Sequence, residues 1–206
     1  HEIDQQDDAR LEMFGDGDRV EDPLLAELVV LEVVDVENVQ ASAGQGDLVL
    51  FGSSADDQVY ALEAASGAVR WRFFTGGPVR FAPVALQDRI FVASDDGYLY
   101  ALALADGKVL WKHRAGPGEQ RVIGNERMIS HWPARGGPVV LDDKVYYSGG
   151  IWPSDGVFVH ALDARTGEKV WSNSETGSIR MAQPHGGAEA LSGVAPQGYL
   201  LARDND

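Results

Sequence analysis

One phrase decides the fold, and it occurs three times: Tyr60-Ala61-Leu62 … Gly67 … Trp71, Tyr100-Ala101-Leu102 … Gly107 … Trp111, and His160-Ala161-Leu162 … Gly167 … Trp171. In every copy the Gly follows the Leu by five residues and the Trp follows the Gly by four. The copies begin 40 and then 60 residues apart. Fixed spacing at a period near 40 residues indicates a repeat architecture, in which every copy is one supersecondary unit.

Each copy predicts two β-strands joined by a tight turn. In the second copy a β-prone run at 99–102 leads into the turn at 105–107, and a run at 108–111 carries the Trp. Gly suits such a turn because a residue without Cβ adopts positive φ at little cost. We expect the Trp side chains to pack in the core and, with the turn glycines, to dock each unit against its neighbour: Trp71, Trp111, Trp171, Gly67, Gly107 and Gly167.

The upstream half of the unit also repeats, because Pro83–Phe91 matches Pro138–Tyr146. The second unit then contains four short strands, expected near 79–86, 89–93, 98–102 and 109–112. Four antiparallel strands in about 40 residues make a β-propeller blade. We therefore predict an all-β fold, a partial propeller over 38–206 with about three blades and the start of another at 194–202.

The third copy carries a family resemblance. The run Leu162-Asp163-Ala164-Arg165-Thr166-Gly167-Glu168-Lys169-Val170-Trp171 resembles the repeat of the pyrroloquinoline-quinone-type (PQQ-like) β-propellers, and the resemblance extends over roughly residues 40–200. The other copies depart from it, with Glu63 and Ala103 in the place of Asp163. WD-type propellers are the alternative, but they usually follow the Trp with Asp, whereas these copies have Arg72, Lys112 and Ser172.

Two classes of function follow from the resemblance. PQQ-like propellers include quinoprotein alcohol dehydrogenases, the periplasmic lipoprotein BamB of the β-barrel assembly machinery, and uncharacterised secreted proteins of planctomycete type. The first class is therefore a non-catalytic binding or assembly scaffold of an extracytoplasmic bacterial protein. The second is a fragment of a PQQ-dependent dehydrogenase whose active site lies in blades outside this chain. We favour the scaffold because the chain has no Cys, and the dehydrogenases carry a vicinal Cys pair over the cofactor. Their calcium ligands and catalytic Asp cannot be placed on this sequence either, so we assign no catalytic residue, cofactor or metal site.

Charge is distributed unevenly along the chain. Residues 1–37 hold thirteen Asp and Glu against two Arg, a large part of the net charge of −15. We interpret them as a solvated, partly disordered lead-in that ends in a strand near 28–36. The overall charge argues against nucleic acid or anionic lipid as a partner. No run of 18 apolar residues and no signal peptide occur in this chain, so a membrane span is not expected.

Length adds one expected partner. Closed propellers have about four to eight blades, and an open arc leaves strand edges unpaired. We therefore expect the remaining blades to belong to the same, longer polypeptide.

An insertion interrupts the repeat after the second Trp. From Trp71 to Pro83 is 12 residues, whereas from Trp111 to Pro138 is 27, and the additional residues fall within 113–132. The stretch at 124–130 with its following Trp-Pro resembles PQQ-like proteins of planctomycete type. Loops on a rigid scaffold often carry binding, so we expect a protein or peptide partner at this insertion or on a propeller face. A tolerated surface insertion is the alternative.

The superposed repeats also predict an anion site. Arg80 and Arg135 occupy one position at the start of two innermost strands, which line the central channel of a propeller. Two guanidiniums there would hold a carboxylate or phosphate, and His131 and Trp132 would supply a wall beside the charge. The alternative is that each Arg pairs with a carboxylate of its own or the next blade, in which case the site fails.

The other polar residues predict turns and strands. Asp95-Asp96 and Asp142-Asp143 have the appearance of calcium ligands, but they lie at expected hairpin turns, where Asp is common. The five His residues lack metal-ligand spacing. His160 replaces the Tyr of the other copies, and we expect it to be a strand residue.

Overall fold

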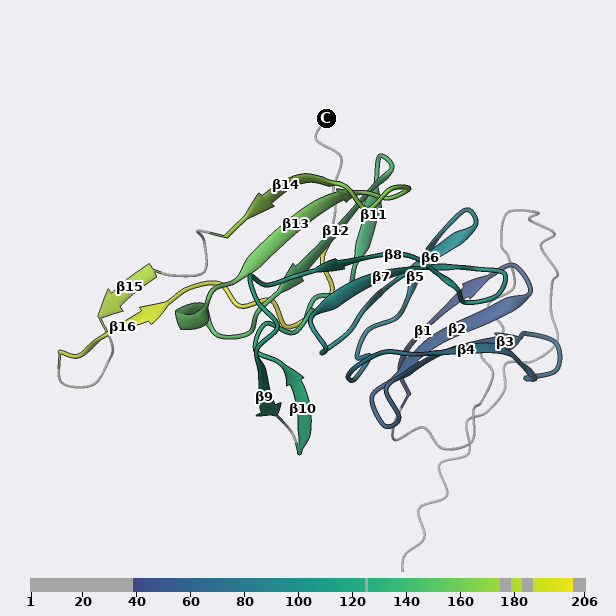
Figure 1. The fold of residues 1–206 in the computed structure, drawn as a ribbon, viewed down its shortest axis with the longest axis horizontal. Helices are drawn as coiled ribbons and strands as arrows, with labels where there is room; N and C mark the ends of the chain where they lie inside the picture. The colour runs from purple at the N-terminus through teal and green to yellow at the C-terminus, as the bar shows by residue number, and fades with distance from the viewer. Residues whose placement is uncertain (1–38, 125, 175–178, 183–186, 202–206) are drawn as a thin grey trace, which may run out of the picture.

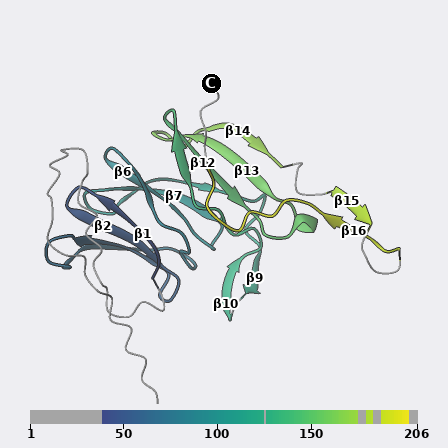
Figure 2. The same cartoon turned by 180° about the vertical axis from the view of Figure 1, so that it is seen from behind.

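The computed structural model describes residues 39–124, 126–174, 179–182 and 187–201. The acidic lead-in at 1–37, with its predicted strand, lies outside these residues. Figures 1 and 2 show from opposite sides that the three large sheets follow one another in an arc. The repeat therefore folds as predicted, into successive blades of an all-β propeller.

Each blade is a four-stranded antiparallel sheet whose strands follow chain order. The first blade contains β1 (Val39–Gln45), β2 (Leu48–Ser53), β3 (Gln58–Glu63) and β4 (Val69–Phe74). The second contains β5 (Val84–Leu86), β6 (Arg89–Ala93), β7 (Tyr98–Ala103) and β8 (Val109–Arg114). The third contains β11 (Val139–Leu141), β12 (Lys144–Gly149), β13 (Phe158–Asp163) and β14 (Lys169–Asn173).

The repeated phrase gives the same local structure in each blade. The register shifts between the Ala and the Leu of all three copies, which marks a β-bulge before the turn. The Gly N–H then donates to the carbonyl four residues earlier, at 2.8–2.9 Å. All three turn glycines have φ between 68° and 75°, the left-handed region that favours Gly.

The core lies between blades. One buried cluster joins the first and second sheets through residues such as Leu50, Val59 and Ile90. A second joins the second and third sheets through Phe91, Leu99 and Tyr147. Each sheet therefore buries its apolar residues against its neighbours, and a single blade has no core of its own.

The innermost strands are shorter than predicted. The expected strand at 79–86 is reduced to β5, and residues 78–83 run as irregular chain. Pro78 and Pro83 lack the N–H that a sheet ladder needs. The segment instead brings Arg80 beside the turn between β6 and β7.

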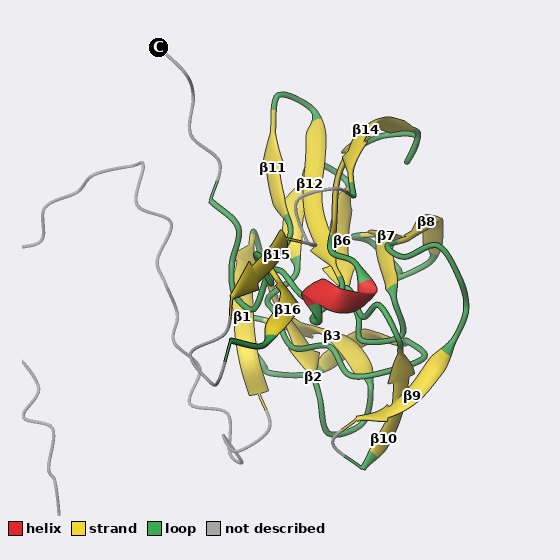
Figure 3. Cartoon of the chain, turned by 90° about the vertical axis from the view of Figure 1, so that its left-hand side faces the viewer, coloured by secondary structure: helices red, strands yellow, loops and turns green. Residues whose placement is uncertain are grey.

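Within the described ranges, two hairpins and one short helix lie outside the blades. The insertion forms β9 (Arg121–Gly124) and β10 (Arg127–Ser130), and β15 (Ile179–Ala182) pairs with β16 (Glu189–Ser192). A 3₁₀ turn, η2 (Pro153–Asp155), lengthens the β12–β13 connection and is the helical segment in Figure 3. Residues 194–201 run back to the third blade, where Tyr199 forms a parallel bridge with Gly137. The described residues contain no helix long and apolar enough to cross a membrane.

Candidate functional site

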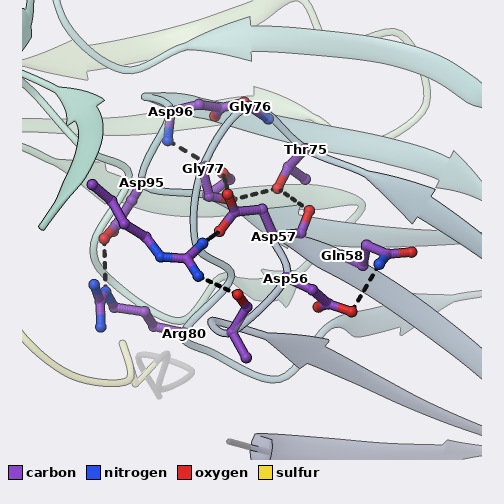
Figure 4. A network of polar contacts seen from close by, with 12 residues as sticks. Asp56, Asp57, Gln58, Thr75, Gly76, Gly77, Arg80, Asp95 and Asp96 are labelled. Atoms are coloured by element: carbon purple, nitrogen blue, oxygen red, sulfur yellow. Dashed lines mark hydrogen bonds and ion pairs between the residues drawn. The ribbon is translucent and has the colours of Figure 1, made fainter.

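The turn between β6 and β7 is the polar centre of the structure. Asp95 in this turn has a side chain that is 1% exposed. Arg80 Nε donates to Asp95 Oδ2 at 2.7 Å, as Figure 4 shows. Arg135 donates from Nε to Oδ1 at 3.0 Å and from Nη2 to Oδ2 at 2.8 Å. One buried carboxylate thus holds two guanidiniums, one of them through two hydrogen bonds.

Arg80 and Arg135, predicted to form an anion site at the channel mouth, are therefore both paired with a carboxylate of the protein. The repeat alignment correctly brings Arg80 and Arg135 to one place, but Asp95 occupies the position expected for a free anion. The ring nitrogens of His131 and Trp132 contact Asp155 and not these arginines: His131 Nε2 lies 3.3 Å from a carboxylate oxygen of Asp155, and Trp132 Nε1 donates to the Asp155 carbonyl at 2.6 Å. By the condition set for it, the anion site at these arginines is not supported.

Asp96, the second residue of the turn, has hydrogen-bond partners other than Arg80 and Arg135. Its carboxylate accepts hydrogen bonds from the backbone N–H of Gly76 and Tyr98, at 2.8 and 3.0 Å, and from the Tyr100 hydroxyl at 2.5 Å. Burial and the adjacent Asp96 charge raise the pKa of Tyr100 far above its ordinary value, so the phenol stays protonated and donates. Figure 4 places Asp96 beside Gly76. The Asp95-Asp96 pair thus lies in a turn, as predicted.

A polar pocket of about 260 Å³ opens next to Asp96, where the insertion leaves β8. Its wall includes three basic side chains, Lys112, Arg114 and Arg121. The pocket combines β7, β8 and the insertion, so it depends on the one segment that the first blade lacks. Sequence analysis found the insertion but not these residues, because Lys112 and Arg114 read only as outward positions of a repeated strand.

The β9–β10 hairpin is fixed to the first blade. Arg127 donates to a carboxylate oxygen of Asp57 at 2.6 Å and to the carbonyl of Ala55. The apolar side chains of Ile123 and Met128 in this hairpin are 79% and 51% exposed. Figure 1 shows the hairpin projecting away from the blades. The insertion is therefore a positioned projection with an apolar surface.

The three repeated Trp residues were predicted to dock each blade against its neighbour, and Trp71 and Trp111 contact the next blade in this way. Trp71 Nε1 donates to the Leu104 carbonyl at 2.9 Å, and Trp111 Nε1 donates to the Ala164 carbonyl at 3.3 Å, so each Trp reaches the turn of the next blade. Trp171 is 43% exposed, and no further four-stranded sheet follows it among the described residues.

The glycines complete these joints. A Cβ on Gly107 would lie 2.6 Å from the Trp71 ring, and one on Gly167 would lie 2.6 Å from the Trp111 ring. The equivalent atom on Gly67 would have nothing within 4 Å. Two of the three repeated pairs therefore form joints between blades in the described structure.

The buried His160 and the half-buried His113 form a cluster that sequence analysis missed. His113 Nδ1 lies 2.5 Å from the Tyr147 hydroxyl, and the His113 and His160 rings are 5.0 Å apart. Burial lowers the pKa of His113 to about 4 and also lowers that of His160. His160 is a strand residue, as expected, and its Nε2 lies 2.8 Å from the Ala115 carbonyl oxygen. Neutral rings thus join the second and third blades.

No described group of three or more His, Asp or Glu side chains has the arrangement of a metal site. Asp142 and Asp143 form the β11–β12 turn, where both have positive φ. Their predicted role as turn residues is consistent with this conformation. Of the described residues, the pocket beside the insertion is the candidate binding site.

Comparison with known proteins identifies the architecture. The sequence matches the family described as outer membrane protein assembly factor BamB over residues 34–174. BamB from Moraxella catarrhalis has 19% identity and a TM-score of 0.50, with 74% of this chain and 45% of that chain covered. No curated protein matches the sequence significantly.

Two dehydrogenases of known structure have a similar fold. Quinohemoprotein alcohol dehydrogenase from Comamonas testosteroni has 21% identity and a TM-score of 0.56, with 68% of this chain and 21% of that chain covered. A europium-containing methanol dehydrogenase has 23% identity and a TM-score of 0.51, with 68% and 26% covered. The chain thus spans less than half the length of these solved structures, and the likeness to them is one of fold.

Proposed function

Because the chain belongs to the family of the outer membrane protein assembly factor BamB, we propose that it is a non-catalytic PQQ-like β-propeller module of an envelope or secreted bacterial protein, and that it binds a protein partner as an assembly scaffold. The observation that carries the proposal is the β9–β10 hairpin, which exposes Ile123 and Met128. Arg127 fixes this hairpin to the first blade. An exposed apolar surface on a fixed projection is typical of a protein-binding site.

The contacts of the acidic residues in the β6–β7 turn also favour a scaffold. The buried Asp95 is engaged by two arginines, and the Asp96 carboxylate accepts three hydrogen bonds. These groups hold segments of the fold together. They act as structural ties between turns and links.

The partner-binding proposal is tested by site-specific cross-linking. A photo-reactive amino acid replaces Ile123 in the full-length protein in its native host, and a matched control replaces Val69, which is 55% exposed on β4. We expect one reproducible cross-linked protein at Ile123 that is absent at Val69. Equal labelling at both positions would contradict a binding role for the hairpin.

The alternative function is that of a PQQ-dependent dehydrogenase fragment, which the fold shared with the Comamonas testosteroni enzyme keeps in view. Titration of the purified chain with pyrroloquinoline quinone and Ca²⁺, followed by absorbance and calorimetry, separates the two functions. We expect no tight binding. Stoichiometric binding at micromolar concentration would overturn the scaffold proposal in favour of the dehydrogenase.

A further inference from the structure

The pocket beside the insertion has basic walls, although the molecule as a whole is acidic. The chain has a net charge of −15, yet Lys112, Arg114 and Arg121 gather around a single pocket of about 260 Å³. Concave sites lined by charge of one sign concentrate ligands of the opposite sign. A ligand can use only those charges in the pocket that neighbouring residues do not already neutralise.

Two acidic residues line the pocket, and the first of them, Asp96, already has hydrogen-bond partners within the protein. Its carboxylate is occupied by the N–H groups of Gly76 and Tyr98 and by the hydroxyl of Tyr100. It is also 6% exposed, so it forms the floor of the pocket. It does not pair with any of the three cations through a hydrogen bond among the described contacts.

Glu119 is the second acidic residue, and it is weakly held. Its carboxylate accepts from Arg114 Nη1 at 3.1 Å and from the Tyr98 hydroxyl at 3.3 Å, while its side chain is 75% exposed. Exposed ion pairs of this kind contribute little stability. Glu119 therefore shows where a carboxylate fits and is itself easily displaced.

The remaining cations are available to a ligand. Lys112 Nζ lies 4.5 Å from the centre of the Tyr98 ring, a cation–π contact, and its ammonium has no hydrogen bond or ion pair with any other described residue. Arg121 lines the pocket beside Gly76, and no hydrogen bond to its guanidinium occurs within the described part of the chain. A guanidinium and an ammonium thus flank the position that Glu119 marks.

The hairpin register extends this site. Met128 pairs with Ile123 and Ser130 pairs with Arg121. Residues two apart on a strand share a face, and directly opposed residues do so too. Arg121 therefore shares one face of the hairpin with the exposed Ile123 and Met128. A basic site and an apolar surface follow one another along a single strand.

We propose that the pocket binds the carboxylate of an acidic residue in a peptide segment of the partner protein, whose neighbouring apolar side chains lie on Ile123 and Met128. The incoming carboxylate replaces Glu119 and accepts from Arg121 and Arg114. The inference rests on the proposed scaffold function and adds the chemistry of the partner. Charge complementarity and the built-in carboxylate select an acidic–apolar peptide.

The direct test uses a fluorescein-labelled peptide, acetyl-Gly-Glu-Leu-Leu-Gly-lysinamide, titrated into the purified chain and followed by fluorescence anisotropy. Arg121→Gln should weaken binding by about tenfold or more, the scale for a charge-assisted hydrogen bond. The same peptide with Gln in place of Glu should weaken to a similar extent. Arg70→Gln is the matched control, because Arg70 is an exposed Arg on the first blade that pairs with Glu63, and it should leave binding unchanged.

A second variant predicts a change of opposite sign. Glu119→Gln removes the built-in competitor, so the peptide should bind several-fold more tightly. Glu63→Gln removes the same charge from the first blade and should have no effect. Equal tightening by both variants would mean that net charge alone controls binding, and it would overturn the site.

Other outcomes separate this inference from the proposed function. A peptide that does not bind, together with specific cross-linking at Ile123, overturns the pocket while the scaffold stands. Inorganic phosphate or acetate that displaces the peptide at equal concentration overturns peptide recognition, because the pocket would then take any small anion. Ile123→Ser should weaken the peptide and leave phosphate binding unchanged, and failure of that distinction also contradicts the proposal.

Discussion

Each joint between blades depends on one tryptophan that lies over one glycine. The indole covers the turn of the next blade and donates its N–H to a carbonyl there, as Trp111 does to Ala164. The glycine opposite Trp111 is Gly167, where a side chain would collide with the ring. The joint thus pairs a large side chain with a residue that has none, and the Trp fits only because the opposite residue is Gly.

The first prediction concerns the glycines. Gly67→Ala and Gly167→Ala both place Ala at positive φ, with φ of 68° and 75°, at a cost of about 1–2 kcal/mol. Only Gly167→Ala also drives a Cβ into the Trp111 ring. We expect Gly167→Ala to lower the free energy of unfolding clearly more than Gly67→Ala, measured by urea denaturation. Equal losses would show that backbone strain alone explains the glycine.

The second prediction concerns the tryptophans. Trp111→Ala should destabilise the chain by about 3–5 kcal/mol, the range for deleting a large packed aromatic side chain. Trp171→Ala should cost much less, since Trp171 is 43% exposed. Chemical denaturation of both variants gives the comparison. A Trp171→Ala variant as unstable as Trp111→Ala would contradict the assignment of the joint.

At the scale of elements, the sequence predicted strands and turns better than links. The repeated Gly and Trp fixed the outer hairpins, because local turn geometry and strand alternation suffice there. The predicted length of the innermost strand was too great. Pro78 cannot donate to a sheet ladder, and the hydrogen bond from Arg80 to the distant Asp95 outweighs the local preference for a strand. The pairing of β9 with β10 was not predicted, because an insertion without a second copy offers no repeat to align.

Contacts between elements were the least predictable. Arg80 and Arg135 were brought together by alignment alone, yet the identity of their partner Asp95 depends on the path of a distant turn. The pocket cations had no motif, because Lys112 and Arg121 become neighbours only when the insertion folds back on the second blade.

The third prediction concerns the interface between β8 and the third blade. Burial, and then the nearby His160, Lys169 and Arg114, lower the pKa of His113 from 6.5 to about 4. The unfolded chain therefore takes up a proton at a higher pH than the folded chain, and stability falls as pH drops from about 6.5 towards about 4. Urea midpoints across this range should decline, and His113→Phe should flatten the decline. An unchanged slope in that variant would remove His113 as the cause.

At the scale of the whole molecule, Asp95 connects all three blades. It lies in the second blade, while Arg80 comes from the link out of the first and Arg135 from the link into the third. Its backbone N–H donates to the Pro78 carbonyl in the first of these links, and its carbonyl accepts from the N–H of Ser130 at the end of β10, each at 2.8 Å. One turn thus sets the relative position of the sheets near the propeller axis.

The fourth prediction tests this connection. Asp95→Asn leaves two largely buried guanidiniums without a counter-charge and should lower the free energy of unfolding by about 3–5 kcal/mol. Asp88→Asn, which breaks the exposed pair with Arg89, should change stability little. Adding Arg135→Gln to Asp95→Asn should restore part of the loss, as a double-mutant cycle measures. Additive losses would contradict the coupling.

The Trp–Gly joint also has a consequence for how such chains evolve. Every blade carries both halves of the joint, a glycine that receives and a tryptophan that inserts, so a duplicated blade arrives with two compatible surfaces. Copying a stretch of gene therefore lengthens the arc without any new interface having to be invented. The insertion after Trp111 lies beyond these surfaces, so its sequence can change without altering either half of a joint.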